Sequence, residues 1–234
     1  MRRKKHRAAM ILAAGQGSRM GDLGERSPKT LLNVGGKPLL QHHIEKLQAA
    51  GFSRIVINAS HLKNQIKDFV ASQVTKDSEI LVSEEESPLE TAGGIAKALK
   101  LIDANVVAVI NGDVFTEIDY GTIFDKTRSL EEKAQYSTFL FLVDNPAHNP
   151  NGDFMLHKNK LVNEKGTVLT YSGIGVYKTE LFKNISTNTK TPLAPTIKKE
   201  IKLGRVLGCH HKGFWYDVGT PDRLRNANLH AEKS

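Results

Sequence analysis

Short apolar runs alternate with helical patterns through the first half of the chain. The runs are "AMILAA", "RIVIN", "EILVS" and "VVAVIN", and helical patterns cover residues 38–50, 62–73 and 91–102 between them. Such alternation is typical of a parallel sheet whose faces are covered by helices. The sequence therefore predicts an α/β fold with a Rossmann-like, mostly parallel sheet flanked by helices.

The pattern changes after the run "TFLFLVD", which ends at Asp144. Hairpin-like pieces follow ("GDFMLHKNKLV" and "VLTYSGIGVY"), then a helical pattern over 193–202, the strand-like "RVLGCH", the aromatic "GFWYDVG" and a helix start at Thr220, Pro221 and Asp222. This order predicts a smaller α+β, lid-like region. With no internal repeat or long linker, we expect a basic tail (1–7) and a single domain (8–234) with two parts, 8–144 and 145–234.

Composition excludes several classes of protein. No apolar run in the 234 residues approaches the roughly 20 that a membrane span needs, so we expect a soluble protein that does not bind membranes. The single Cys209 cannot form an internal disulfide, which fits the cytoplasm. The net charge of +8 comes without a continuous basic and aromatic surface for nucleic acid, and it suits a small polyanionic substrate instead.

The stretch "AAMILAAGQGSRM", directly behind "MRRKKHR", has two interpretations. A secretory signal needs an apolar core of about 7 to 15 residues, so residues 8–14 are at the shortest limit, and the glycines at 15 and 17 interrupt the run before any convincing cleavage site. The alternative is a buried strand that opens into a glycine loop, with Arg19 and Lys29 close behind. We favour the second interpretation, in which the loop holds phosphates.

Two well-known phosphate loops do not match this one. A P-loop needs Gly-Lys-Ser/Thr after its glycines, and the "KT" at Lys29 follows Pro28 instead. A dinucleotide loop leads straight into a helix and needs an acid at the end of the second strand, where this chain has Asn58. What remains is a long loop whose backbone N–H groups approach an anion, or else a plain surface turn.

Several motifs together resemble the sugar-1-phosphate nucleotidyltransferase family. "LAAGQGSRM", "SPKTLL" and "GGKPLLQHHIEKLQAAG" are similar to its N-terminal signature, "SPLETAGGIAKAL" to its base-recognition segment, and "NGD" and "FWYDVGTPDRL" to its metal motifs. "LETAGGI", "VDNPAHNPNGDF", "TYSGIGV" and "LAP" most resemble the group within it that acts on N-acetylmuramate 1-phosphate. One departure is the segment from Gly21 to Leu23, where the family usually has Pro-Leu-Thr.

The residues suggest the same chemistry independently. Asp113 follows a buried strand, and Asp217 lies in the apolar "FWYDVG". Two carboxylates brought together would repel each other unless a divalent cation lay between them, and Mg²⁺ is usually bound by one or two carboxylates with substrate phosphates. A sugar phosphate is already an anionic nucleophile, so no general base is required. Alternatively, Asp113 caps a turn and Asp217 makes a structural ion pair.

The resemblance assigns roles to particular residues, with 8–144 as the nucleotide-binding part and 145–234 as the sugar-binding part. Arg19 would neutralise the β- and γ-phosphates and Lys29 the α-phosphate, while Asp113 and Asp217 would hold Mg²⁺. The expected nucleotide contacts are Ala13, Ala14, Gly15, Gly17, Glu85, Gly93 in a turn, and Asn111. The expected sugar contacts are Asn145, Gly152, Asp153, Ser172 and Gly173. Lys165 resembles the family's sugar-phosphate lysine, although the proline that usually follows is missing.

Three functions remain open from the sequence. The first is transfer of UMP from UTP to N-acetylmuramate 1-phosphate in cell-wall (peptidoglycan) sugar recycling, with Glu85 accepting N3–H of uracil. The second is the same reaction with another base or substrate: mannose or glucose 1-phosphate, or phosphocholine with CTP. The third is a catalytically silent sugar-nucleotide sensor, or a nucleic-acid binder acting through its tail.

Two pairs of adjacent histidines, His42-His43 and His210-His211, suggest zinc. Adjacent residues point in different directions on either a helix or a strand, so we expect both pairs at the surface or behind the site and not on zinc.

Overall fold

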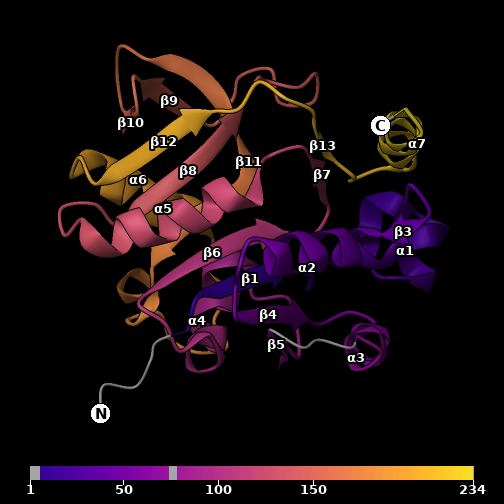
Figure 1. Cartoon of the computed structure of the whole chain (residues 1–234). Coiled ribbons are helices and arrows are strands. Elements are labelled where there is room, and N and C mark those ends of the chain that lie inside the picture. Colours follow the sequence, from indigo (N-terminus) through magenta and orange to yellow (C-terminus); the bar gives the residue numbers. More distant parts are fainter. Residues whose placement is uncertain (1–5, 74–77, 234) are drawn as a thin grey trace.

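The computed structural model of the chain describes residues 6–73 and 78–233. Its centre is a nine-stranded sheet in the order β5-β4-β1-β6-β11-β8-β12-β10-β9 (Figure 1). In chain order, these strands are β1 (Ala8–Leu12), β4 (Arg54–Ala59), β5 (Glu79–Glu84), β6 (Val106–Asn111), β8 (Thr138–Val143), β9 (Phe154–His157), β10 (Lys160–Val162), β11 (Thr167–Lys178) and β12 (Val206–His210).

The first half of the sheet is parallel, as the alternating sequence pattern predicts. β1 pairs in parallel with both β4 and β6, and β4 with β5. The runs are apolar at consecutive positions because both faces are covered: Ala9 and Ile11 of β1 pack on one face, Ala8 and Met10 on the other. The first face is covered by α2 (Leu39–Ala49), α3 (Lys63–Ala71) and α5 (Tyr120–Glu132), the second by α4 (Glu90–Ile102) and α6 (Leu193–Lys202). In Figure 1, α2 and α5 cross the front of the sheet.

The second half of the sheet is mostly antiparallel. β11 pairs antiparallel with β6 and β8, β12 lies parallel to β8, and β10 and β9 follow. β9 also pairs with the start of β11, so the strands β11, β8, β12, β10 and β9 form a closed ring of pairings. The "VLTYSGIGVY" segment, expected as hairpin-like, is one long strand whose register shifts between Tyr171 and Gly175 at a bulge.

A small substructure lies beside the parallel half (Figure 1). It contains the ribbon of β7 (Val114–Thr116) and β13 (Trp215–Asp217), the ribbon of β2 (Asn33–Val34) and β3 (Lys37–Pro38), and α7 (Pro221–Ala231). A separate apolar cluster holds it together, made by Val34, Leu39, Val218 and Ala227. The "FWYDVG" segment therefore forms an edge ribbon and not a strand of the main sheet.

Most expected helices lie where the sequence predicts them, within one or two residues. α6 has the predicted bounds, and the Thr220 hydroxyl caps α7 by accepting from Arg223 N at 3.4 Å. Pro38 precedes α2 instead of occupying its first turn, while Gly51, with a φ of 92°, follows its end as expected. The sequence analysis missed α5, whose N-cap Asp119 accepts from Gly121 N and Thr122 N.

The N-terminal stretch follows the strand-and-loop interpretation. Residues Ala8–Leu12 form β1, with β4 and β6 on its two sides. Arg7, which the sequence places in the tail, already bonds to the body, because its carbonyl accepts from Ser53 N at 3.0 Å. Residues 1–5 of the expected tail lie outside the described residues. Among the helices of the described residues, none is both long and apolar enough to cross a bilayer.

Candidate active site

The glycine loop runs from the end of β1 into a short helical turn (Ser18–Met20) and α1 (Asp22–Arg26). Gly17 has a φ of 68°, and a Cβ on Gly24 would lie 2.3 Å from the Gly17 carbonyl, so the loop folds tightly on α1. A cavity of about 330 Å³ opens over the loop. Its lining includes Gly15, Gly17 and three cations, Arg19, Lys29 and Lys190. This arrangement of backbone and positive charge suits a polyphosphate.

Lys29 and Asp113 meet at the centre of the site. Lys29 lies in a helical turn (Lys29–Leu31), and its Nζ donates to Asp113 Oδ2 at 2.6 Å. Asp113 follows β6 after a tight turn at Gly112, where a Cβ would lie 2.6 Å from Thr30 and 2.8 Å from the Leu12 carbonyl. Only glycine fits there, so close packing explains the glycine of the "NGD" motif. It places Asp113 beyond the carboxyl end of a parallel strand, where α/β sheets bind ligands.

Asp217 reaches the same place through the β7–β13 ribbon. It pairs in register with Val114, the neighbour of Asp113, and Val218 N donates to the Asp113 carbonyl at 2.7 Å. The backbone thus brings the two expected metal ligands together. Each carboxylate is largely buried, with 21% and 23% of its side chain exposed, and each pairs with a cation.

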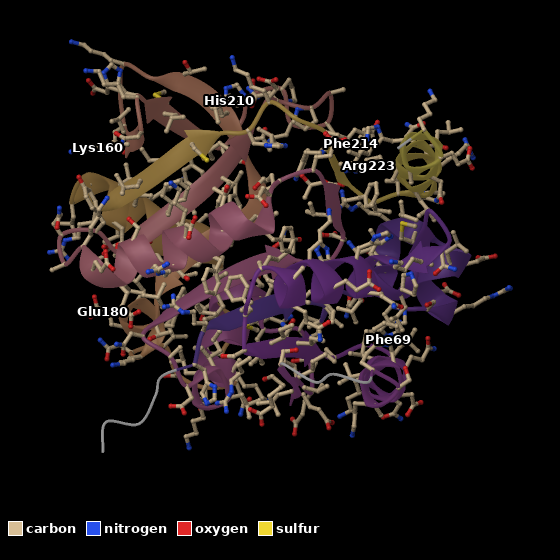
Figure 2. The ribbon with its side chains drawn as sticks, in the orientation of Figure 1. Phe69, Lys160, Glu180, His210, Phe214 and Arg223 are labelled. Atoms are coloured by element: carbon tan, nitrogen blue, oxygen red, sulfur yellow. The ribbon has the colours of Figure 1, made fainter. Side chains whose placement is uncertain are left out.

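Two partners of Asp217 were missed by the sequence analysis. Arg223 extends from α7 toward β13 and donates to Asp217 Oδ1 (Figure 2). His148 Nε2 lies 3.2 Å from Asp217 Oδ2. Asp217 therefore pairs through its backbone with Val114 of the first part of the chain and through its side chain with His148, in the 144–153 loop. Arg223 stands in the quoted closing motif, whereas nothing in the sequence connects His148 with Asp217.

A second cavity, of about 320 Å³, lies beside the loop at the ends of the parallel strands. Its lining includes Ala13, Ala14, Gly15, Glu85, Asn111 and Asp113. Of the three acids in "SEEES", Glu85 is the buried one, while Glu84 forms exposed ion pairs with Lys63 and Lys67. The sequence expectation for Glu85 thus falls on the acid that lines this cavity.

Asn58 connects the glycine loop to Glu85. Its Oδ1 accepts from Ala13 N at 2.8 Å, and its Nδ2 donates to Glu85 Oε1 at 2.7 Å. Glu85 Oε2 accepts from Leu89 N at 2.9 Å. From the sequence alone, Asn58 was notable only because it stands where a dinucleotide-binding site has an acidic residue. Its position at the end of β4, next to β1, is the signal that indicates this role.

Gly93 lies in α4, within the helix predicted over 91–102, so the turn expected near it for base recognition does not form there. It belongs to the first turns of α4, and its N donates to the Thr191 carbonyl at 3.1 Å. A Cβ there would lie 2.4 Å from the Thr189 carbonyl. Gly93 therefore lets the segment at 189–191 pack on α4. Its neighbour Gly94 faces Glu85 and Asn58, because a Cβ on Gly94 would meet Glu85 Oε1 at 2.9 Å.

A third and larger cavity, of about 600 Å³, lies between the ring of strands and α6. Gly152 and Asp153 line it, as does Asn111, which it shares with the cavity beside the loop. Tyr171 and Tyr177 line it with hydroxyls 2.8 Å apart, and burial raises the pKa of both phenols. They remain neutral hydroxyls at physiological pH.

Other expected sugar contacts brace this region. The Ser172 hydroxyl donates to the Phe141 carbonyl at 2.8 Å and accepts from Ile174 N, and Gly173, with a φ of 78°, packs on the Asn111 side chain at the bulge. Asn145 donates to the Pro150 and Val168 carbonyls. Lys165 lies exposed in the turn between β10 and β11, and the cavity's lysine is Lys198 of α6.

Glu90 lines all three cavities and was missed by the sequence analysis. It begins α4 with a φ of 60°, a conformation that is uncommon for residues other than glycine. Thr91, like Asn111, lines both the cavity at the ends of the parallel strands and the cavity between the ring and α6. The three cavities therefore form one continuous groove, with Glu90 at their junction.

The histidine pairs do not form a metal centre. His43 is buried behind the "NGD" turn, with Nδ1 2.6 Å from the Tyr120 hydroxyl, and burial lowers its pKa to about 3. His42 Nε2 lies 2.8 Å from the Val34 carbonyl. His210 Nε2 lies 2.9 Å from Asp144 Oδ1. Within the described ranges 6–73 and 78–233, no group of three or more His, Cys, Asp or Glu side chains could hold a metal.

Known proteins resemble this chain over almost its whole length. The family model described as nucleotidyl transferase matches residues 8–234. An N-acetylmuramate alpha-1-phosphate uridylyltransferase of Neisseria meningitidis serogroup B is 45% identical over 223 residues, covering 94% of this chain and 96% of that protein. Another protein of that name, from Caulobacter vibrioides, is 30% identical and covers 91% and 92%.

A solved structure shares the fold. HddC from Yersinia pseudotuberculosis, complexed with GMP-PN, superposes with a TM-score of 0.76 at 24% identity, covering 95% of this chain and 98% of that one. Together with the groove and its paired aspartates, these likenesses identify the chain as a member of the nucleotidyl transferase family and an enzyme of the sugar-1-phosphate nucleotidyltransferase type.

Proposed function

We propose that this enzyme transfers UMP from UTP to N-acetylmuramate 1-phosphate, giving the UDP-sugar and pyrophosphate. The observation that carries the proposal is the 45% identity, over 94% of the chain, to a relative with that name. The continuous groove supports it, because it offers adjoining spaces for a base, a polyphosphate and a sugar. The product would enter cell-wall sugar recycling in the cytoplasm.

The uracil would occupy the cavity beside β1 and β4. Glu85 is held there by Asn58 and the Leu89 N–H, and each carboxylate oxygen can accept more than one hydrogen bond. It can therefore still accept N3–H of uracil. The triphosphate would lie over the glycine loop, where Arg19 and Lys190 neutralise the leaving pyrophosphate.

The donor set fits Mg²⁺. Asp113 and Asp217 are hard oxygen ligands brought together by the β7–β13 ribbon, and in the structure each is neutralised by a side-chain cation. When bound, the ion would neutralise charge on the phosphates and help to orient them for in-line attack. Lys29 lines both the base and phosphate cavities, so its ammonium would stabilise charge that develops on the α-phosphate.

The sugar phosphate would attack without help from a general base, since a phosphate monoester is already an anion at neutral pH. What the chain contributes is alignment. Asn111 lines both the base and sugar cavities, and Gly173, whose φ is positive, packs against its side chain and holds it in place.

A panel of four nucleoside triphosphates and several sugar 1-phosphates, scored by pyrophosphate release, tests the proposal. We expect UTP with N-acetylmuramate 1-phosphate to give the highest kcat/KM. A preference for GTP with mannose 1-phosphate, or for a nucleotide with glucose 1-phosphate, would assign another substrate to the same chemistry. No pyrophosphate release with any pair would favour a silent sensor.

A further inference from the structure

The cavity of about 600 Å³ between the ring and α6 is where the sugar would bind, and we call it the sugar cavity. Four residues of α6 line it: Leu193, Ala194, Ile197 and Lys198. These positions follow an i, i+1, i+4, i+5 pattern, which places them on one side of a helix. Leu193 and Ile197 pack against the sheet, and Lys198 adds a cation to the cavity wall. Its neighbour Lys199 is also exposed but turns about 100° further around the helix, away from this lining.

Lys198 differs in position from the cations that serve the phosphates. Lys29 lines the base and phosphate cavities, and Lys190 lines the phosphate cavity. Lys198 lines the sugar cavity and neither of the others. Lys198 therefore borders the space where the sugar's own substituents would lie, and its charge is not needed to neutralise the triphosphate.

The charges around Lys198 leave it without a protein counter-ion. Asp153, in the same cavity, accepts from Tyr171 N at 2.8 Å and from Asn149 Nδ2 at 3.1 Å. Glu90 lies at the junction with the other two cavities. Among the ion pairs of the described residues, none involves Lys198. A carboxylate on the sugar would supply the missing partner.

We propose that Lys198 binds the lactyl carboxylate of N-acetylmuramate 1-phosphate and thereby sets the preference for this sugar over N-acetylglucosamine 1-phosphate. The two sugars differ by that lactyl group, so a cation in the sugar cavity is the group that distinguishes them. This inference rests on the proposed function. Lys198 is a specificity-determining residue in it and takes no part in the transfer itself.

Lys198→Gln tests the inference, with Lys199→Gln as the matched control and Lys198→Arg as the conservative variant. The readout is kcat/KM for each of the two sugar phosphates at saturating UTP. A charge-assisted hydrogen bond corresponds to about a ten- to hundred-fold effect, so Lys198→Gln should lose that factor with N-acetylmuramate 1-phosphate. We expect N-acetylglucosamine 1-phosphate to change by less than about two-fold. Lys198→Arg should keep most of the preference, and Lys199→Gln all of it.

The outcomes separate the inference from the function on which it rests. If the unaltered enzyme prefers N-acetylmuramate 1-phosphate and Lys198→Gln keeps that preference, the inference is wrong and the function stands. An equal loss with both sugars would also overturn it, because it would indicate a structural or catalytic role. If the unaltered enzyme does not use N-acetylmuramate 1-phosphate, the proposed function itself fails.

Discussion

The part of the groove proposed to hold the nucleotide (the nucleotide half) and the part proposed to hold the sugar (the sugar half) are built differently. In the first, Asn58 lies near the end of β4, Asp113 and the glycine loop follow the neighbouring strands β6 and β1, and motif residues line the cavities directly. In the second, residues of β8, β9, β11 and α6 surround the cavity, while the motif residues Asn145 and Ser172 bond to the backbone. Motif residues therefore line the cavities where parallel strands end together, whereas in the ring some line the cavity (Gly152 and Asp153) and others brace the backbone (Asn145 and Ser172).

The largest expected effect concerns Asp113, a proposed Mg²⁺ ligand of the nucleotide half. Asp113→Asn removes a ligand charge without changing its size, and we expect kcat to fall on the order of 10³-fold, equally for all sugar phosphates. Steady-state rates across a magnesium titration measure this effect. Asp68→Asn, at an exposed position of α3, is the control. Magnesium-independent turnover near that of the unaltered enzyme would remove Asp113 from the site.

Arg19→Ala should have the next largest effect. Arg19 lines the phosphate cavity, and loss of a preorganised charge partner lowers kcat about 10²- to 10³-fold. Arg26→Ala, exposed in α1 nearby, should stay close to the unaltered rate. If the KM for UTP rose while kcat held, Arg19 would bind the nucleotide equally in ground and transition states.

Ser172→Ala tests the sugar half of the groove. Ser172 is fully buried, and its loss leaves the Phe141 carbonyl and the Ile174 N–H without a partner, so the free energy of unfolding should fall by about 1–3 kcal/mol. Urea unfolding measures it, with the exposed Ser186→Ala as control. The KM for the sugar phosphate should change little. A large rise in that KM with unchanged stability would make Ser172 a sugar contact and break the comparison.

The smallest expected effect concerns His43, which is buried behind the "NGD" turn of the nucleotide half. Burial lowers the pKa of His43 from 6.5 to about 3, so the unfolded chain takes up the proton first as the pH falls. The stabilising effect of neutral His43 is complete above about pH 6.5 and is lost toward pH 3. Between pH 7 and 5.5 the unfolding free energy should fall by about 1 kcal/mol more than in His43→Leu. Urea unfolding of both proteins at the two pH values measures the difference. An equal fall in unfolding free energy for the unaltered protein and His43→Leu would contradict the prediction.

The sequence predicts the nucleotide half well for a physical reason. Buried parallel strands must be apolar on both faces, and a loop that approaches phosphate needs glycine, so both leave patterns in adjacent residues. Lys29 and Asp113 were found because each stands in a short motif next to such an element. Their 2.6 Å contact depends on Gly112, which is part of the same motif.

Contacts between distant segments were not predictable in this way. His148 meets Asp217 only after β7 and β13 have paired, and Lys198 reaches the sugar cavity only because α6 packs across the ring. Glu90 was missed because its φ of 60° is a tertiary consequence that no propensity indicates. α5 was missed although its sequence carries a capping aspartate.

The closed ring of strands also has a consequence for how molecules of this protein meet one another. Ring closure pairs β9 on both sides and leaves β5 at the end of the strand order. An unpaired sheet edge invites edge-to-edge aggregation, and charged ends oppose it. β5 carries Glu79, paired with Arg54, at one end and Glu84, paired with Lys63 and Lys67, at the other. These ion pairs place charge where a second strand would have to align, so among the described strands the edge at β5 is protected by charged side chains.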